Sequence, residues 1–196
     1  MELTLARYRA DPAVDFIVCF FHHCAYSTTK DHASDGGVRG AWAGLFDRYH
    51  VDVVLQAHNH VFERSDPIRG GSPTRVAGDR SEVTSVSDGT VYYTVGGGGR
   101  PRYGFQDGES ESYRGNEVAD TSVPNSYVVA ADGSKVPESL TWSRVRFRNY
   151  SFVRADVTPG IPGITPSRMR IAAVDEYGRE FDEVTFRREL PLAFGS

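Results

Sequence analysis

The chain has 196 residues, of which 39% are hydrophobic and 24% charged, as is ordinary for a soluble globular domain with a sizeable core. Its net charge of −4, with basic residues scattered along the chain, argues against a nucleic-acid surface. No apolar run approaches the length of a membrane span, and two cysteines are too few for a disulfide scaffold or a thiolate metal site.

The first elements alternate between helix and strand. Residues 2–10 are predicted to form the last part of a helix, which ends at Asp11 and Pro12. The unbroken apolar run 16–21 has strand length and predicts a parallel strand that is covered on both faces. Residues 42–49 repeat apolar side chains at helical spacing and predict a crossover helix after the flexible Asp35-Gly36-Gly37.

Histidines follow two neighbouring strands of the predicted sheet. A second buried strand is predicted over residues 51–57, and it ends in histidine as the first one does. Because the carboxyl ends of parallel strands face one crevice, we expect His22, His23, His58 and His60 to converge. Neutral imidazole is the commonest protein ligand for zinc. From residue types alone, the simplest interpretation is one metal ion held by His22, His58 and His60, with an open position for water.

The remainder of the chain is predicted to be mostly strands and polar loops. Residues 65–90 form a polar excursion with little core, and residues 90–95 form a strand that ends at four glycines. This glycine run lacks the lysine and the hydroxyl residue of a nucleotide-binding loop. Residues 101–140 are predicted to be a flexible polar insertion with little regular structure. Further strands are predicted at Trp142 and over residues 150–157, 169–174 and 181–186, with a hairpin turn at 175–178.

Two segments carry a family resemblance. Residues 20–27 (FFHHCAYS) resemble the fourth motif, and residues 56–64 (QAHNHVFER) the fifth motif, of the calcineurin-like metallophosphoesterases, most closely those of the purple acid phosphatase branch. Members of this family hold two metal ions, bridged by a carboxylate and a hydroxide, in a four-layered sandwich, and they hydrolyse phosphate esters. The resemblance implies an α/β fold class: half of a four-layer α/β/β/α sandwich, with a mixed sheet and antiparallel strands toward the C-terminus.

The resemblance also implies roles for individual histidines. His22 and His58 would bind one metal ion and His60 the other, the ions being Fe, Zn or Mn. His23 would not be a ligand, and would at most face phosphate or support a ligand. His32 lies about where purple acid phosphatases place a histidine that contacts phosphate or protonates the leaving group.

Three further residues near the motifs are assigned less directly. Glu63 and Arg64 look like the Glu-Arg pair of the family and are expected to fix the loop, although an arginine near the crevice could bind phosphate. Cys24 stands where the family usually has proline, so we expect a partly exposed thiol.

The chain departs from the family pattern at its beginning. The first three motifs of the family supply an Asp and a His, then an Asp with a Tyr, then an Asn-His pair, and all of them precede the fourth motif, which here begins at Phe20. We therefore expect residues 1–196 to be the C-terminal portion of a catalytic domain, with weak or absent turnover alone. A missing N-terminal half or a homo-oligomer would be its partner, and a phosphate monoester or diester its substrate.

Two alternatives stay open at this point. One is a self-contained zinc hydrolase with a single metal ion and three histidine ligands. The other is a non-catalytic module that binds a metal ion or a partner chain through an exposed sheet edge. The first residues lack the apolar core of a signal peptide. The sequence does not identify the cellular compartment.

Overall fold

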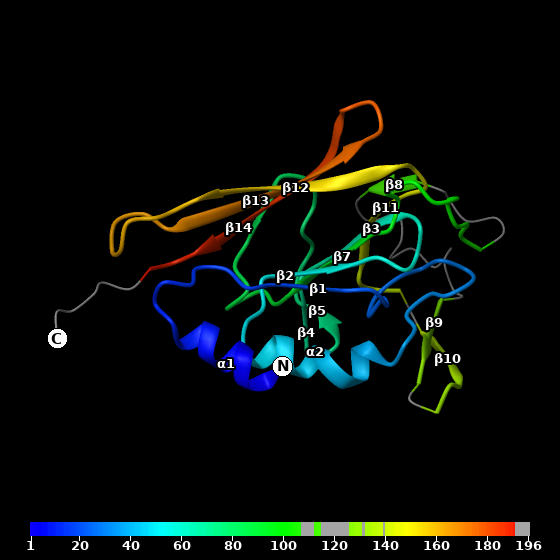
Figure 1. Cartoon of the computed structure of the whole chain (residues 1–196), viewed down its shortest axis with the longest axis horizontal. Coiled ribbons are helices and arrows are strands. Elements are labelled where there is room, and N and C mark those ends of the chain that lie inside the picture. The colour runs from blue at the N-terminus through cyan, green and yellow to red at the C-terminus, as the bar shows by residue number, and fades with distance from the viewer. Residues whose placement is uncertain (107–111, 115–125, 131, 139, 191–196) are drawn as a thin grey trace.

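The computed structural model describes residues 1–106, 112–114, 126–130, 132–138 and 140–190, and their elements stack in layers (Figure 1). Helices α1 (Glu2–Ala10) and α2 (Val38–Arg48) cover one face of a six-stranded sheet. The other face of this sheet packs against a four-stranded sheet. The mixed α/β class that the sequence predicts is confirmed.

The six-stranded sheet contains both predicted parallel strands. Its strands lie in the order β1 (Val18–Phe21), β2 (Val53–Gln56), β7 (Val91–Val95), β3 (Phe62–Ser65), β11 (Ser143–Phe147) and β8 (Ser112–Arg114). The first three are parallel, and the other pairings are antiparallel. Helix α2 connects β1 to β2, so the predicted strand–helix–strand crossover is confirmed.

The second sheet is formed mainly by the end of the chain. It contains β12 (Ser151–Thr158), β13 (Ser167–Asp175), β14 (Glu180–Arg188) and β6 (Ser81–Val83), in that order. Strands β12 to β14 are antiparallel, as predicted, and the Gly178 N–H donates to the Asp175 carbonyl at the predicted turn. Two small antiparallel pairs join β4 (Ile68–Arg69) to β5 (Ser72–Pro73) and β9 (Ser126–Val129) to β10 (Lys135–Glu138).

Successive side chains of the central strands enter two different cores. On β2, Val53 packs between the two sheets, whereas Val54 packs under the helices. On β7, Tyr92 faces the helices and Tyr93 the second sheet. This alternation is the period of an extended strand, and it explains why both strands are apolar at nearly every position.

Strand β1 corrects one prediction. It lies at the end of the sheet order, and Phe20 is 83% exposed, so β1 is not covered on both faces by the part of the chain that the structure describes. The long polar segments also hold more structure than predicted. Residues 65–90 contain β4, β5 and β6, with Ile68 and Val83 buried, and the described part of 101–140 contains β8, β9 and β10. Whether 101–140 is a flexible insertion stays a prediction. Among the described helices, none has the length and apolarity to cross a membrane.

Candidate metal centre

The carboxyl ends of β1 and β2 bring His22 and His58 together. The two strands pair with Phe21 opposite Gln56, and the Ala57 N–H donates to the His22 carbonyl at 3.1 Å. His58 follows with a φ of +23°, a conformation that side-chain-bearing residues rarely adopt. Its Nδ1 lies 3.0 Å from Nε2 of His22. The expected convergence of histidines at these strand ends is therefore found for this pair.

Three more side chains surround the His58 ring. Nε2 of His58 lies 3.3 Å from the Asp35 Oδ2 carboxylate oxygen. Nδ1 of His32 lies 3.6 Å from the same oxygen, and the His32 and His58 ring centroids are 4.3 Å apart. The His23 ring lies 4.9 Å from that of His58. His58 is thus the centre of a cluster that consists of His22, His23, His32, Asp35 and His58, which we call the His58 cluster.

The Asp35 carboxylate was missed by reasoning from sequence, which treated Asp35-Gly36-Gly37 only as a flexible stretch. The signal available was an acidic residue three positions after His32 and directly before two glycines. Gly36 has a φ of +70°, and a Cβ built there would lie 2.8 Å from Cβ and Cγ of His23. Glycine therefore allows the loop to pass directly against His23 and to present Asp35 to His58.

The environment of His58 favours its neutral form. Partial burial lowers the pKa of His58 below its usual value, and the Asp35 carboxylate opposes this effect. The neighbouring rings of His32, His23 and His22 lower the pKa further. Neutral imidazole is the form that binds metal ions, so this environment favours the form of His58 that can act as a ligand.

His60 lies in a different environment from His58. Its Nδ1 is 2.9 Å from the Pro101 carbonyl oxygen, and its ring stacks on Tyr103 with centroids 4.2 Å apart. A carbonyl can only accept, so Nδ1 donates the proton and the lone pair of His60 is on Nε2. The ring centroid of Tyr103 also lies 5.3 Å from that of His32, so Tyr103 connects His60 to the edge of the His58 cluster.

Arg64 corrects one expectation of the sequence analysis. Its side chain is fully buried, Nε and Nη2 donate to the Asp182 carboxylate at 2.6 and 2.8 Å, and Nη1 donates to the Ala77 carbonyl. All of its nitrogens are engaged between the two sheets, so Arg64 does not face the crevice and we do not assign it to substrate. Phe62 precedes it by two positions and faces the same core, as the strand period requires.

Glu63 points to the opposite side of β3 and supports the segment before His32. It accepts hydrogen bonds from the Ser27 hydroxyl and from the N–H and hydroxyl of Thr28. Burial raises the pKa of Glu63, while these hydrogen bonds and the nearby charge of Arg146 oppose the shift. The loop-fixing role expected of Glu63 matches these contacts.

Cys24 is fully buried, so the expectation of a partly exposed thiol was wrong. Its Sγ lies 3.6 Å from the Ala57 carbonyl oxygen and 3.7 Å from the Thr94 hydroxyl. Burial raises the pKa of this thiol to about 12, and it raises the pKa of the half-buried Cys19 to about 11.

Both thiols should therefore resist alkylation in the folded chain. Because the thiolate is the reactive form, we expect iodoacetamide at pH 8 to label Cys24 at least about 10²-fold more slowly in buffer than in urea. Labelling should accelerate as pH rises, since the thiolate fraction grows toward the raised pKa. Peptide-resolved mass spectrometry measures both rates, and rapid labelling of Cys24 in buffer would contradict its burial.

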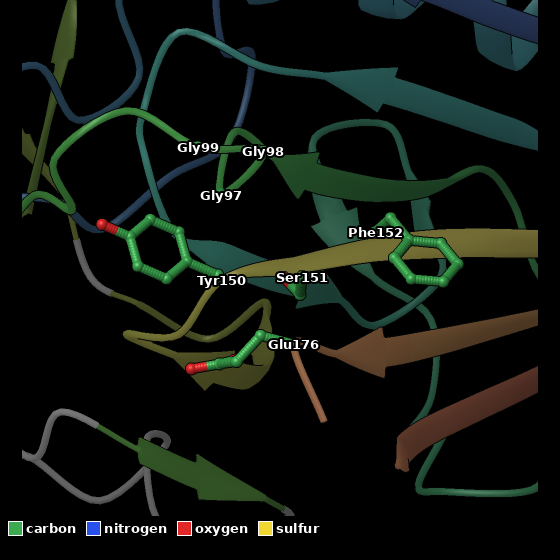
Figure 2. A pocket seen from close by; sticks show the side chains of 7 residues that line it. All are labelled: Gly97, Gly98, Gly99, Tyr150, Ser151, Phe152 and Glu176. Atoms are coloured by element: carbon green, nitrogen blue, oxygen red, sulfur yellow. The ribbon is translucent and has the colours of Figure 1, made fainter. Parts of the chain in front are cut away.

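The glycine run after β7 lines a separate pocket of about 290 Å³, formed by Gly97, Gly98, Gly99, Tyr150, Ser151, Phe152 and Glu176 (Figure 2). Glycine backbone, two aromatic rings, the Ser151 hydroxyl and one carboxylate surround it, and none of the residues of the His58 cluster does. The pocket therefore includes none of the candidate metal ligands.

Comparison with known proteins places this arrangement in a wider context. No protein-family model matches the chain. The chain is 35% identical over 182 residues to uncharacterized proteins from two strains of Mycobacterium tuberculosis, a match that covers 85% of this chain and 33% of each relative. It is 32% identical over 85 residues to a phosphoenolpyruvate phosphatase from Allium cepa, which covers 43% of this chain and 18% of that enzyme.

A solved structure extends the likeness to almost the whole chain. The fold is similar to that of a purple acid phosphatase isolated from yellow lupin (Lupinus luteus) seeds, with a TM-score of 0.61 and 16% identity. The match covers 96% of this chain and 28% of the lupin enzyme, and the chain spans about a third of the length of the mycobacterial relatives. The two sheets and their helices thus have the fold of one part of a purple acid phosphatase.

Proposed function

We propose that this chain is the histidine-bearing part of a metal-dependent phosphoester hydrolase. The observation that carries the proposal is the 3.0 Å separation of His22 Nε2 and His58 Nδ1 at adjacent strand ends, in a chain with the fold of a purple acid phosphatase. Two imidazole nitrogens at this separation can serve one metal ion, whose bonds to histidine are about 2.0–2.1 Å long for zinc. The substrate would be a phosphate monoester or diester.

His60 fits the role of a ligand to a second ion. Its Nδ1 donates to the Pro101 carbonyl at 2.9 Å, which leaves the Nε2 lone pair free for a metal. A histidine ligand usually donates its other ring N–H to a carbonyl or a carboxylate, because this bond fixes the tautomer and the ring orientation. We therefore assign His22 and His58 to one ion and His60 to the other. When bound, the ions would supply Lewis-acid neutralisation of charge on the phosphoryl oxygens.

His32 and His23 would act on the substrate. The Asp35 carboxylate lies 3.6 Å from His32 Nδ1 and can fix the orientation of this imidazole. His32 can then donate a proton to the oxygen of the leaving group. His23 is exposed beside His58 and can donate a hydrogen bond to phosphate. Carboxylate ligands that bridge the ions would come from a further segment or a second copy of the chain.

The test is an assay of the 196-residue chain with aryl phosphate mono- and diesters in the presence of Zn²⁺, Mn²⁺ or Fe²⁺. We expect slow hydrolysis, below about 1 s⁻¹, because among the described residues His60 belongs to no group of three possible metal ligands. EDTA and His58→Gln should remove this activity, and the exposed substitution Asp31→Asn should leave it unchanged. Absence of metal-dependent hydrolysis, or equal rates in the chain and in His58→Gln, would contradict the hydrolase. Turnover at an ordinary enzyme rate would contradict the need for other ligands.

A further inference from the structure

We propose that His23, Asp35 and His58 form a mononuclear site for a divalent transition-metal ion such as Zn²⁺, as an alternative to the ligand set that the family resemblance implies, with which it shares His58. One ligand atom from each of the three residues lies within 4.8 Å of the other two. His23 and Asp35 are not ligands in the implied set. The inference concerns what this chain binds by itself, and it does not depend on the proposed hydrolase activity.

The Asp35 carboxylate is the strongest indication of a cation. Its Oδ2 lies 3.3 Å from His58 Nε2, and its Oδ1 is buried without a hydrogen-bond partner among the described residues. A buried carboxylate oxygen without a donor is unfavourable, because it has lost its hydrogen bonds to water and no protein donor replaces them. A metal ion that Asp35 held through both carboxylate oxygens would satisfy it.

The loop that holds Asp35 is fixed against His23. Any side chain at Gly36 would overlap the His23 ring, since a Cβ there would lie 2.8 Å from Cγ and 3.0 Å from Cδ2. Gly36 and Gly37 both have positive φ angles, and helix α2 begins directly after them at Val38. The carboxylate and the His23 imidazole are thus brought together by a backbone geometry that glycine supplies.

The two metal sets use opposite sides of the His58 ring. Nδ1 faces His22 at 3.0 Å, whereas Nε2 faces Asp35 at 3.3 Å. An ion that binds with His22 therefore needs Nδ1, and an ion that binds with Asp35 needs Nε2. Because a neutral imidazole has one lone pair, one chain can use only one of the two sets at a time. Substitutions of the neighbouring residues His22 and His23 therefore distinguish the two ligand sets.

Two imidazoles and one carboxylate are a recurrent donor set for single ions. They hold catalytic zinc with an open fourth position, and non-haem iron in a facial arrangement. Imidazole nitrogen suits first-row transition ions better than Ca²⁺ or Mg²⁺, which prefer oxygen. The proposed ligand is accordingly Zn²⁺ or a similar ion, bound with at least one position left for water.

The experiment is a Zn²⁺ titration of the purified chain in competition with a chromogenic chelator. We expect one tight equivalent per chain and a loss of affinity of more than about 10-fold in His23→Gln and in Asp35→Asn. His22→Gln and the matched carboxylate control Asp31→Asn should change the affinity by less than about 3-fold, since neither residue belongs to the proposed donor set. Circular dichroism of each variant verifies that it is folded, and the absorption of bound Co²⁺ gives a second readout that His23→Gln should alter.

Three results would overturn the site. If His22→Gln weakens binding while His23→Gln does not, the ion is held by the set proposed for the hydrolase. If Asp35→Asn weakens binding and His23→Gln does not, Asp35 only positions His58. If the folded chain binds no stoichiometric Zn²⁺ or Co²⁺, the three side chains are not a metal site. Loss of phosphoester hydrolysis with retained binding would instead contradict only the proposed function.

Discussion

Replacing Asp182 by alanine is expected to lower the free energy of unfolding by about 3–5 kcal/mol, because it removes the partner of a buried arginine. Arg64 on β3 and Asp182 on β14 have side chains that are 0% and 1% exposed, and they form two hydrogen bonds between the two sheets. Burial alone would lower the pKa of Arg64, but the adjacent carboxylate raises it above its usual value. In the Asp182→Ala variant the guanidinium would stay charged and buried, without a counter-ion.

Urea unfolding, followed by circular dichroism, measures this loss. The matched control is Asp156→Ala, which removes an exposed carboxylate that pairs with Arg154 and Arg170 on the second sheet. This substitution should leave the urea midpoint unchanged. A double variant, Arg64→Met with Asp182→Leu, should be closer to the unaltered chain than Asp182→Ala is, because it removes both charges and keeps an apolar filling. Equal midpoints for Asp182→Ala and Asp156→Ala would show that the pair does not hold the sheets together.

Periodicity explains which parts of the fold could be predicted from the sequence. The apolar spacing of residues 42–49 and the strand-length runs around them predicted α2 and its flanking strands correctly. The same periodicity also placed Arg64 on the side of Phe62, between the sheets, although its place after the histidines suggested the crevice. Local spacing therefore determines the face on which a side chain lies, and sequence proximity to a motif does not.

Burial and loop contacts could not be predicted in the same way. The run 16–21 is equally apolar whether or not a neighbour covers it, so the 83% exposure of Phe20 at the sheet edge depends on the surroundings of β1. The approach of Asp35 to His58 depends on the path of a glycine-containing loop, which no periodic pattern encodes. The resemblance drew attention to His22, His58 and His60, and the carboxylate beside them became visible only in three dimensions.

Gly96→Ala is expected to disrupt the loop that carries His58 and His60. A Cβ at Gly96 would lie 2.1 Å from the Asn59 carbonyl oxygen and 2.8 Å from that of Ala57, so the backbone of the histidine loop would have to move. Overpacking against a rigid backbone costs about 1–3 kcal/mol or more, because no flexible side chain can yield. The shift should also weaken Zn²⁺ binding by more than about 10-fold, since ligand geometry must be held closely.

Gly98→Ala is the matched control for this prediction. A Cβ at Gly98 meets no atom within 4 Å and faces the open pocket that the glycine run lines (Figure 2). Alanine at such a position should leave the melting temperature and the Zn²⁺ affinity close to those of the unaltered chain, because it is strained by neither neighbours nor backbone. If Gly96→Ala instead melted and bound Zn²⁺ like Gly98→Ala, the histidine loop would not rest on β7, and the positions of both histidines would need another support.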